Sequence, residues 1–210
     1  MGDMVKNATK SDHQREKIIS IAREMFAENG FEATTTRKIN QEAGIAEGLM
    51  YYYFPHGKRE ILDTIVYQGI TERMKQVHFT LTDCESTDDL EQRLLTVFKR
   101  VWSIFQNEEN YQSFMITIRE RMLLSQGQAD WLLGVLNGLV DQIAVQFKAI
   151  SAILPIQSDQ CHPLARVVVS IYQKVIYDEL LIKNNRHMTP EITAQLQPQL
   201  HLVLGLLQAA

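Results

Sequence analysis

Apolar residues along most of this chain recur at intervals of three and four positions, which is the spacing of an amphipathic α-helix. The clearest case is the segment 12–29, where the repeat is carried by Ile18, Ile21, Ala22, Met25 and Phe26. No stretch shows the sustained alternation with β-branched residues that is typical of strands. The pattern therefore predicts an all-α protein.

Capping residues, glycines and prolines divide this helical pattern into segments. Asp12 is the expected N-cap of the first helix, and Gly30 and Gly44 stand where a helix end needs positive φ. Pro163 and Pro190 fall in first turns, where a missing N–H costs nothing. We expect helices over residues 12–29, 36–43, 47–53, 58–79, 89–106, 109–125, 129–154, 163–184 and 190–208, with polar breaks at 82–88 and 155–159.

Two of these helices, 36–43 and 47–53, are short and are joined by a turn at Gly44. This is the layout of a helix-turn-helix unit, whose first helix crosses the DNA backbone and whose second enters the major groove. Each helix then needs a packed inner face and a polar outer face. The expected inner set is Ile39, Ala43, Ile45, Met50 and Phe54, and the outer set is Arg37, Lys38, Glu47, Leu49 and Tyr52.

The aromatic run from Tyr51 to Phe54 tests this interpretation. Four consecutive helical residues cannot share one face at about 3.6 residues per turn. At least one tyrosine must therefore point outward, and we expect that residue to be Tyr52, with Phe54 in the core.

The same segment resembles the TetR family of transcriptional regulators, and the resemblance covers residues 13–62, about a quarter of the chain. It is specific because the shared residues keep fixed spacings over a long stretch. These residues are Gly30-Phe31, Thr35-Thr36-Arg37-Lys38-Ile39, Ala43-Gly44-Ile45 and Gly48-Leu49-Met50-Tyr51-Tyr52-Tyr53-Phe54, followed by a lysine. The resemblance implies a three-helix DNA-binding domain over 1–57 and a larger helical domain for effector binding and dimerisation over 58–210.

The resemblance also implies a role for individual residues at the DNA. Contacts to phosphate are expected from Thr35 and Thr36, because a helix N-terminus favours an anion. Tyr51 and Lys58 are expected to meet phosphate too, and Arg37 to reach phosphate or a base edge. Base reading is expected from Glu47, which can accept from cytosine N4, from Leu49, which can contact a thymine methyl group, and from Gly48 and Tyr52.

Two positions depart from the family pattern. Ala46 stands where many relatives carry a side chain that caps the next helix, and a lost cap costs roughly 1 kcal/mol. The segment from Phe54 to Lys58 has one residue more than the commoner spacing, which puts the placement of Lys58 in question and leaves Gly57 to absorb the extra length.

The larger part of the chain carries many aromatic and methionine residues at helical spacing. Most of them are expected to be core, as such residues usually are. Some are expected to line an apolar effector pocket, namely Trp102, Phe105, Phe114, Met115, Ile118, Arg119, Met122, Trp131 and Tyr172. Arg119 would pair there with an anionic ligand, or else with neighbouring carboxylates or solvent.

The last two helices carry broad apolar stripes, which we assign to a homodimer. The residues concerned are Val168, Ile171, Val175, Leu196, Leu200, Val203, Leu204 and Leu207. Two-fold DNA sites need two reading heads, and the resemblance implies a four-helix bundle at this interface. The alternative is that either stripe is satisfied within one subunit.

Charge and composition narrow the class of protein. The net charge is −4, but residues 1–60 hold nine basic and nine acidic residues, so the acid excess lies beyond them. DNA binding must then depend on where the cations point. Cys84 and Cys161 have no metal-ligand spacing, so we expect two ordinary thiols and no metal. No signal peptide or membrane span is evident, which indicates a cytoplasmic protein.

The function that these observations favour is ligand-controlled transcriptional regulation, most simply a repressor released from a palindromic operator by a small molecule. No metalloprotease, P-loop, nucleophile-elbow or dinucleotide motif is present, so neither an enzyme nor a cofactor is expected. An all-helical enzyme and a scaffolding or membrane-associated helical protein are the alternatives. Salt-dependent binding to duplex DNA distinguishes all three.

Overall fold

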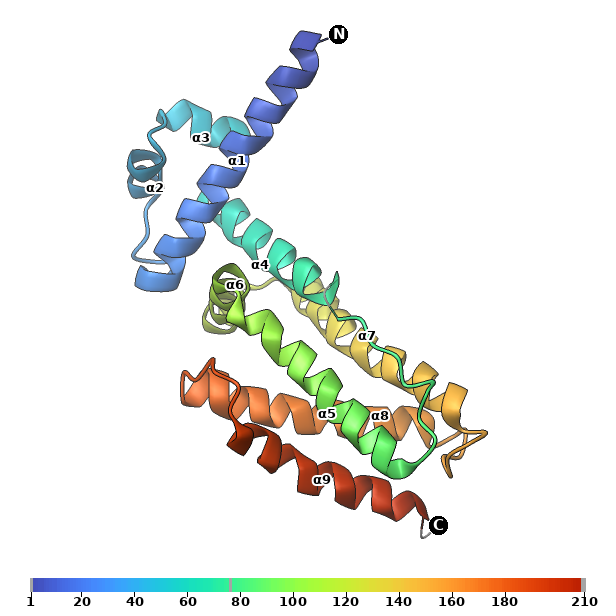
Figure 1. Cartoon of the computed structure of the whole chain (residues 1–210). Helices are drawn as coiled ribbons and strands as arrows, with labels where there is room; N and C mark the ends of the chain where they lie inside the picture. Colours follow the sequence, from blue (N-terminus) through green and yellow to red (C-terminus); the bar gives the residue numbers. More distant parts are fainter. Residues whose placement is uncertain (1, 76, 209–210) are drawn as a thin grey trace. The chain divides into compact units, whose positions relative to one another are not determined.

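The computed structural model describes the backbone of residues 2–75 and 77–208 and the side chains of 11–71 and 77–207, and in these ranges every regular element is a helix (Figure 1). The prediction of an all-α fold is thereby confirmed. The chain forms two compact units, the first from Met1–Arg73 and Glu108–Leu124 and the second from Met74–Asn107 and Ser125–Ala210. Each unit therefore joins two separate stretches of the sequence.

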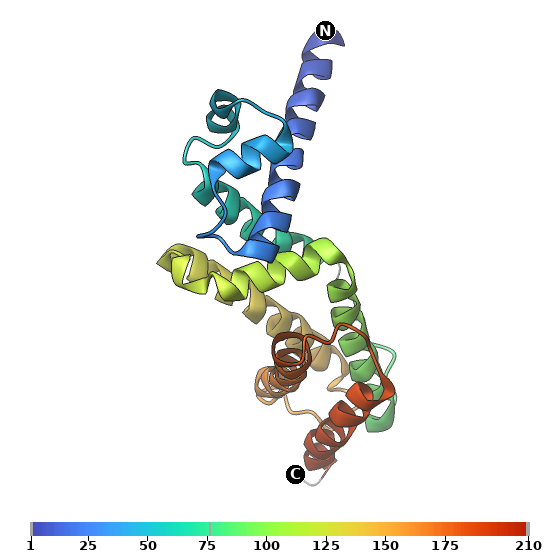
Figure 2. The same cartoon turned by 90° about the vertical axis from the view of Figure 1, so that its left-hand side faces the viewer.

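The first unit contains the two short helices and the longer helices that support them. Its elements are α1 (Gly2–Asn29), α2 (Thr36–Ala43), α3 (Glu47–Tyr53), α4 (Lys58–Lys75), α6 (Glu108–Arg119) and a 3-10 turn at Arg121–Leu123. Helix α1 packs against α2 and α6, and α2 packs against α3. In Figure 2, α6 crosses the C-terminal end of α1.

The core of the first unit follows from the periodicity of its helices. Fully buried side chains come from α1, α2, α3 and α4, namely Ile18, Ala22, Phe26, Ile39, Met50, Ile61 and Leu62. Burying a large aliphatic or aromatic side chain contributes roughly 1.5–3 kcal/mol each. The helix-turn-helix is thus held by the same apolar stripe that predicted it.

Polar contacts attach α6 to the corner that follows α1, which comprises residues 30–34. Gly30 takes φ 84° there. Arg119 donates from Nη1 to the Ala27 carbonyl oxygen at 3.1 Å, and the Phe31 amide donates to Oε1 of Glu120, also at 3.1 Å. Helix α6 therefore supplies partners to backbone groups that the end of α1 leaves unpaired.

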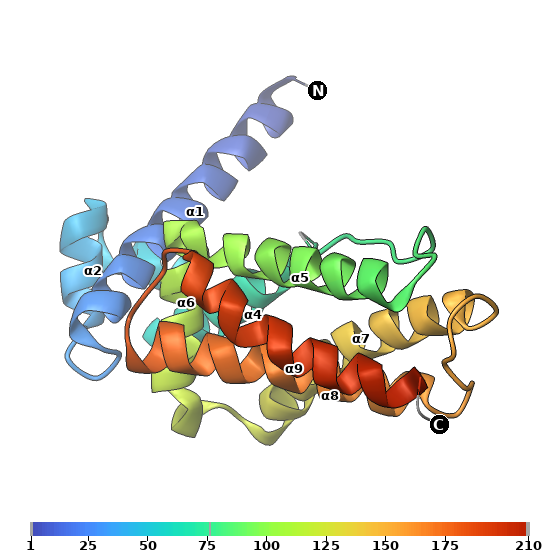
Figure 3. The ribbon, with the colours of Figure 1, turned by 60° about the horizontal axis from the view of Figure 1, so that its bottom comes forward.

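The second unit is a set of long helices that lie side by side (Figure 3). Its elements are α5 (Thr87–Ser103) with a 3-10 turn at Ile104–Gln106, α7 (Gln126–Ile150), α8 (Cys161–Ile176) with a π-helical turn at Tyr177–Ile182, and α9 (Pro190–Gln208). Helix α8 packs against α7 and α9, and α9 also packs against α5.

An aromatic cluster forms the centre of the second unit. The ring of Phe98 lies 5.8 Å from that of Trp102 and 5.2 Å from that of Tyr172, measured between centroids. The Tyr172 hydroxyl donates to the Leu94 carbonyl oxygen at 2.6 Å, and the Trp102 indole donates to that of Arg186 at 3.1 Å. Each buried polar end therefore has the partner that burial requires.

Several predicted helix ends are wrong. Helix α1 begins at Gly2, so Asp12 lies inside it and is not its N-cap. No proline or glycine follows Gly2 before the end of α1, so nothing in the sequence stops the helix at residue 12. Helix α4 ends at Lys75 instead of residue 79. In the segment that follows, the Leu81 amide donates to the Gln146 side chain at 3.1 Å, so tertiary bonds replace helical ones.

Helices α6 and α8 end at Arg119 and Ile176 instead of residues 125 and 184, and a 3-10 turn and a π-helical turn follow them. The remaining bounds differ by four residues at most, and α2, α3 and α9 match the prediction. Helix α7 begins at Gln126, three residues before the prediction, because Ser125 and Gln128 form a reciprocal capping box. Cys84 and Cys161 are both buried free thiols, as expected. Burial raises the pKa of both. Among the described residues, no helix has the length and apolar character needed to cross a membrane.

Candidate nucleic-acid interface

Helix α2 is fixed at both ends by the residues that the sequence indicated. Thr35 is its N-cap, with extended backbone (φ −103°, ψ 152°), and its side chain accepts from the Lys38 amide at 3.2 Å. Gly44 ends the helix in the left-handed region at φ 67° and ψ 38°. The first-turn amides of Thr36 and Arg37 have no acceptor within the helix, which suits them to an anion.

Helix α3 presents most of its surface to solvent. Met50 is its one buried residue, and Tyr52 is 73% exposed, which confirms the outward orientation expected for this tyrosine. Phe54 is fully buried, as predicted. Glu47, Gly48, Leu49 and Tyr51 are also exposed. Ala46 takes the extended N-cap backbone but makes no side-chain hydrogen bond to the helix. The absence of a side-chain cap on α3 is therefore confirmed.

The turn between α3 and α4 brings two predicted phosphate contacts together. Gly57 has φ 64°, and a Cβ atom at this position would lie 3.5 Å from the Tyr51 ring and 3.8 Å from Cγ2 of Thr36. Both side chains therefore approach one glycine, which has the positive φ that absorbs the extra residue. The His56 amide donates to Oε2 of Glu60 at 3.0 Å and closes the turn.

Lys58, the first residue of α4, is half-buried and directs its ammonium group toward the protein itself. Nζ donates to the carbonyl oxygens of Phe31 at 2.9 Å and Thr34 at 3.2 Å. It also lies 4.1 Å from the centroid of the Phe31 ring. The predicted phosphate contact of Lys58 stays a prediction, and the structure gives this ammonium three partners within its own unit.

The remaining predicted contacts lie on the outer faces of α2 and α3, which are on the same side of α1 (Figure 1). Arg37 and Lys38 are exposed on α2, and Glu47 is exposed at the start of α3. An arrangement of cations and a helix N-terminus on α2 beside a polar, aromatic α3 is suited to a phosphate backbone and an adjacent groove.

Two basic residues of α1 that sequence reasoning missed contact the helix-turn-helix segment. Lys17 donates from Nζ to the Ala43 carbonyl oxygen at 2.9 Å and so satisfies the C-terminus of α2. The guanidinium of Arg15 lies 5.0 Å from the centroid of the Phe54 ring. Neither contact has a local sequence signal, because both join residues more than twenty positions apart.

The structure distributes the predicted effector-pocket residues over both units. Trp102, Phe105 and Tyr172 are buried in the second unit, where Trp131 is half-buried. Phe114, Met115, Ile118, Arg119 and Met122 belong to the first unit. Met122 is 84% exposed, and Arg119 pairs with Glu120 at 3.2 Å, so the carboxylate alternative describes this arginine. Neither unit by itself gathers the whole predicted set.

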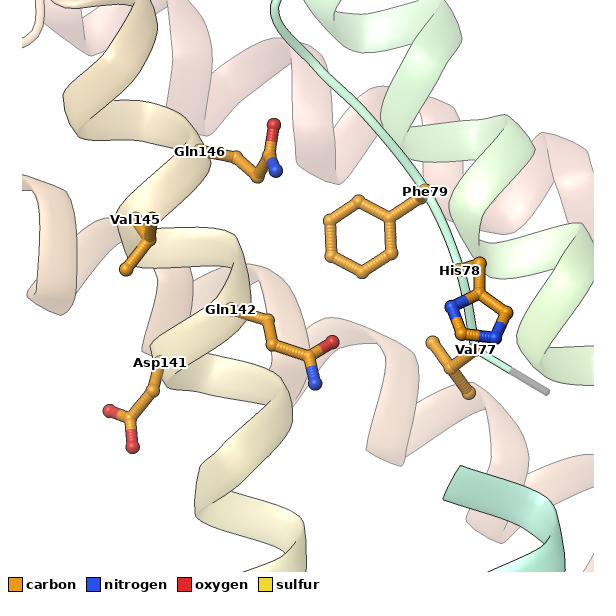
Figure 4. A pocket seen from close by; sticks show the side chains of 7 residues that line it. All are labelled: Val77, His78, Phe79, Asp141, Gln142, Val145 and Gln146. Atoms are coloured by element: carbon orange, nitrogen blue, oxygen red, sulfur yellow. The ribbon is translucent and has the colours of Figure 1, made fainter. Parts of the chain in front are cut away.

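A groove of about 480 Å³ in the second unit was not predicted (Figure 4). It lies between the extended segment 77–79 and α7, and its lining mixes apolar and polar side chains: Val77, His78, Phe79, Asp141, Gln142, Val145 and Gln146. Asp141 is already paired with Nε2 of His162 at 3.3 Å. Nothing in the sequence indicated this groove, since the segment 77–79 was expected to be helical.

The predicted dimer stripe lies mainly on the inward side of its helices, which corrects that assignment. Five of its members are buried within the single chain: Val168, Val175, Leu196, Leu200 and Leu204. A side chain enclosed by its own subunit is not available to a partner. Ile171, Val203 and Leu207 are half-buried, while Val167, Leu202 and Leu206 form an exposed apolar set on α8 and α9.

The capped α2, the glycine turn and the open face of α3 define a protein of the helix-turn-helix class. Residues 18–65 match the model of the family described as bacterial regulatory proteins, tetR family. This segment of the chain is therefore that of a TetR family regulatory protein.

Similar proteins agree with this assignment. The chain is 32% identical over 110 residues to the HTH-type transcriptional regulator YxaF of Bacillus subtilis (strain 168), a match that covers 51% of this chain and 55% of that one. It is 36% identical over 63 residues to the HTH-type transcriptional repressor KstR2 of Mycobacterium tuberculosis (strain ATCC 25618 / H37Rv), covering 30% and 31%. The matched segments thus span about half or less of these relatives.

Solved structures share the fold over nearly the whole chain. PfmR, a TetR family transcriptional regulator from Thermus thermophilus, has a TM-score of 0.62 and 16% identity, covering 90% of this chain and 97% of that one. A SmeT–triclosan complex has a TM-score of 0.57 and 19% identity, covering 94% and 90%. At these identities the likeness concerns the fold alone.

Proposed function

We propose that this protein is a DNA-binding transcriptional regulator that acts in the cytoplasm, where its DNA partner lies. The observation that carries the proposal is the open outer face of α3, whose single buried residue is Met50. A recognition helix must be held by its own core and remain accessible to a groove, and α3 meets both conditions.

In the proposed complex, α2 holds the DNA backbone and α3 reads the bases. Thr35, Thr36, Arg37 and Tyr51 contact phosphates and fix the register of the head, without reading sequence. Base edges fall to Glu47, Gly48, Leu49 and Tyr52. Glu47 accepts from a cytosine amino group, and the absence of a side chain at Gly48 lets the backbone approach the groove.

The first experiment measures binding of the full chain to duplex DNA as salt is raised. Phosphate contacts release counterions, so the logarithm of the affinity should fall linearly with the logarithm of salt concentration. An enzyme or a scaffold would show no such dependence. A duplex enriched from random DNA by the wild-type protein then serves as the operator probe.

The base-reading role of Glu47 is tested by repeating that selection with Glu47→Ala. We expect the preference to relax at the base pair that Glu47 contacts, by about 1–3 kcal/mol of discrimination. Glu28→Ala, which removes an exposed carboxylate from α1, is the matched control and should leave the selected sequence unchanged. An unaltered preference in Glu47→Ala would remove the base-reading role.

The finer mechanism is that of a homodimeric repressor on a palindromic operator, released by a small molecule. KstR2 is named a repressor, which supports repression by analogy. SmeT has been obtained as a complex with triclosan, which supports a small-molecule ligand in the same way. A ligand can release DNA only if it binds the low-affinity state more tightly. Titrating the protein–DNA complex with triclosan is the first test, with intrinsic tryptophan fluorescence as the independent readout of binding.

A further inference from the structure

We propose that Lys58 is a positioning residue of the DNA-binding site, which locks the corner before α2, and is not itself a phosphate contact. The inference rests on the proposed DNA-binding function. It starts from the direction of the Lys58 ammonium, which points into the first unit toward the segment 31–34.

The contacts of Nζ account for the bonding capacity of the ammonium. A lysine has three N–H donors and no acceptor. Two of them reach the carbonyl oxygens of Phe31 and Thr34, at 2.9 and 3.2 Å. The face of the Phe31 ring, 4.1 Å from Nζ, supplies a cation–π contact on a further side.

The corner that Lys58 holds leads directly into the phosphate-binding end of α2. Thr34 is fully buried, and its hydroxyl lies 2.8 Å from the Gly30 carbonyl oxygen and 3.2 Å from that of Met25. Thr34 thus ties the corner to α1, and Lys58 ties it to α4. The next residue is Thr35, the N-cap, so these bonds fix the direction in which the first-turn amides of α2 point.

Turning Lys58 toward DNA would break this arrangement. Phe31 and Thr34 are 6% and 0% exposed, so their carbonyl groups would lose a charged partner in a place that water reaches poorly. The Phe31 carbonyl oxygen would keep the Thr34 amide as a donor at 3.3 Å, whereas the Thr34 carbonyl oxygen would be left unpaired, which is costly to the folded state. The extra residue at Gly57 lies between the buried Phe54 and the start of α4. It gives a structural reason why Lys58 departs from the phosphate contact that the family resemblance implies.

A chemical footprint of the wild-type chain tests the proposal without any substitution. The full-length protein is treated with an acetylating reagent, free and bound to the enriched duplex, and the modification of each lysine is measured by mass spectrometry. We expect Lys58 to react slowly in both states, and the exposed Lys38 to react readily when free and to be protected by DNA. A Lys58 that reacts readily in the free protein and is protected by DNA would overturn the proposal.

Salt dependence of binding gives the second test, with Lys58→Met and Arg37→Gln as a matched pair that each remove one cation. Loss of a phosphate contact should make the slope shallower by about 0.9 per subunit. We expect this for Arg37→Gln, whereas Lys58→Met should keep the wild-type slope and lose about three- to tenfold in affinity at every salt concentration, because fewer molecules hold the competent corner.

Hydrogen exchange of the free proteins separates positioning from simple loss of charge. Amides of residues 31–36 should exchange faster in Lys58→Met than in the wild type, and Arg37→Gln should leave the amides of 31–34 unchanged. A shallower slope for Lys58→Met with unchanged exchange would overturn the proposal. If Lys58→Met does not fold, the wild-type footprint still decides. Wild-type protein that shows no salt-dependent binding would instead contradict the proposed function.

Discussion

Ala46 shows how one residue can weaken a functional helix. It occupies the N-cap of α3 with the right backbone, φ −72° and ψ 151°, but has no side chain to accept from the first turn. We predict that Ala46→Ser raises the free energy of unfolding by about 1 kcal/mol. Urea denaturation measures the change. Ala46→Val, which cannot cap, is the control, and equal stabilisation by both variants would contradict the explanation.

Glu179 is a buried carboxylate whose stability contribution depends on pH. Its side chain is 5% exposed and accepts from Nδ2 of Asn185 at 2.9 Å and from Nζ of Lys183 at 2.5 Å. The Asn185 bond, followed by the Lys183 bond, lowers the pKa of Glu179 below its usual range. A lowered folded-state pKa means stability that is present above the unfolded pKa of about 4.3 and lost as pH falls through the folded value.

We therefore predict that Glu179→Gln destabilises the protein by about 2 kcal/mol near neutral pH, because Asn185 and Lys183 lose a charged acceptor. The difference from wild type should shrink as pH falls below the ordinary glutamate range. Denaturation of both proteins across a series of pH values measures this. Asp178→Asn, which breaks an exposed pair with Lys174, should cost little at any pH. A Glu179→Gln cost that does not vary with pH would refute the assignment.

At the scale of elements, the sequence predicts the short helices α2 and α3 better than the long ones, with the exception of α9. Thr35 and Gly44 are local signals with a direct backbone consequence, and α2 begins and ends where they indicate. The inner residues Ile39 and Met50 are buried, as their spacing predicts. The bounds of α2 and α3 and their central buried residues were therefore predictable from residues within a few positions of one another.

Features that depend on distant contacts were not predictable. In α8 and α9 apolar residues lie on more than one side, so periodicity alone could not tell the inward Leu200 from the outward Leu202. The segment after α4 leaves the helix because Gln146 and Arg100 bind its backbone. The Lys58 contacts have the same origin, since Phe31 and Thr34 are far from it in sequence.

Helix α6 is an element whose role in the first unit can be measured. The Glu120 carboxylate, directly after this helix, accepts from the Phe31 amide and from Arg119, and it is 14% exposed. We predict that Glu120→Ala costs about 1–2 kcal/mol and speeds hydrogen exchange at Phe31. Arg121→Ala, which removes one exposed bond to Ile118, is the control. Unchanged exchange at Phe31 in Glu120→Ala would show that α6 does not hold the corner.

At the scale of the whole molecule, the two compact units do not follow the order of the chain. The expected boundary at residue 57 separates the helix-turn-helix from the rest, whereas the compact unit around it also includes most of α4 and all of α6. Ile61 and Leu62 of α4 are fully buried in this unit. The compact unit that contains the helix-turn-helix therefore depends on α6, which begins more than fifty positions after residue 57.

The proposed homodimer makes a further prediction for the whole molecule. Val167, Leu202 and Leu206 are 43%, 65% and 64% exposed on α8 and α9, and exposed large apolar side chains are candidates for an interaction surface. The double substitution Leu202→Glu and Leu206→Glu should therefore convert a dimer into a monomer in sedimentation experiments at micromolar concentration. Because a palindrome is bound by two linked heads, affinity for the enriched duplex should fall by about a hundredfold or more.

Ile153→Glu is the matched control for this variant, because Ile153 is 59% exposed but lies outside both helices. It should leave the dimer and its DNA affinity unchanged. Circular dichroism of all three proteins should be the same, since none of the altered side chains belongs to the core. A Leu202→Glu, Leu206→Glu protein that remains dimeric would place the interface elsewhere. One that becomes monomeric yet keeps full affinity would show that a single head suffices for binding.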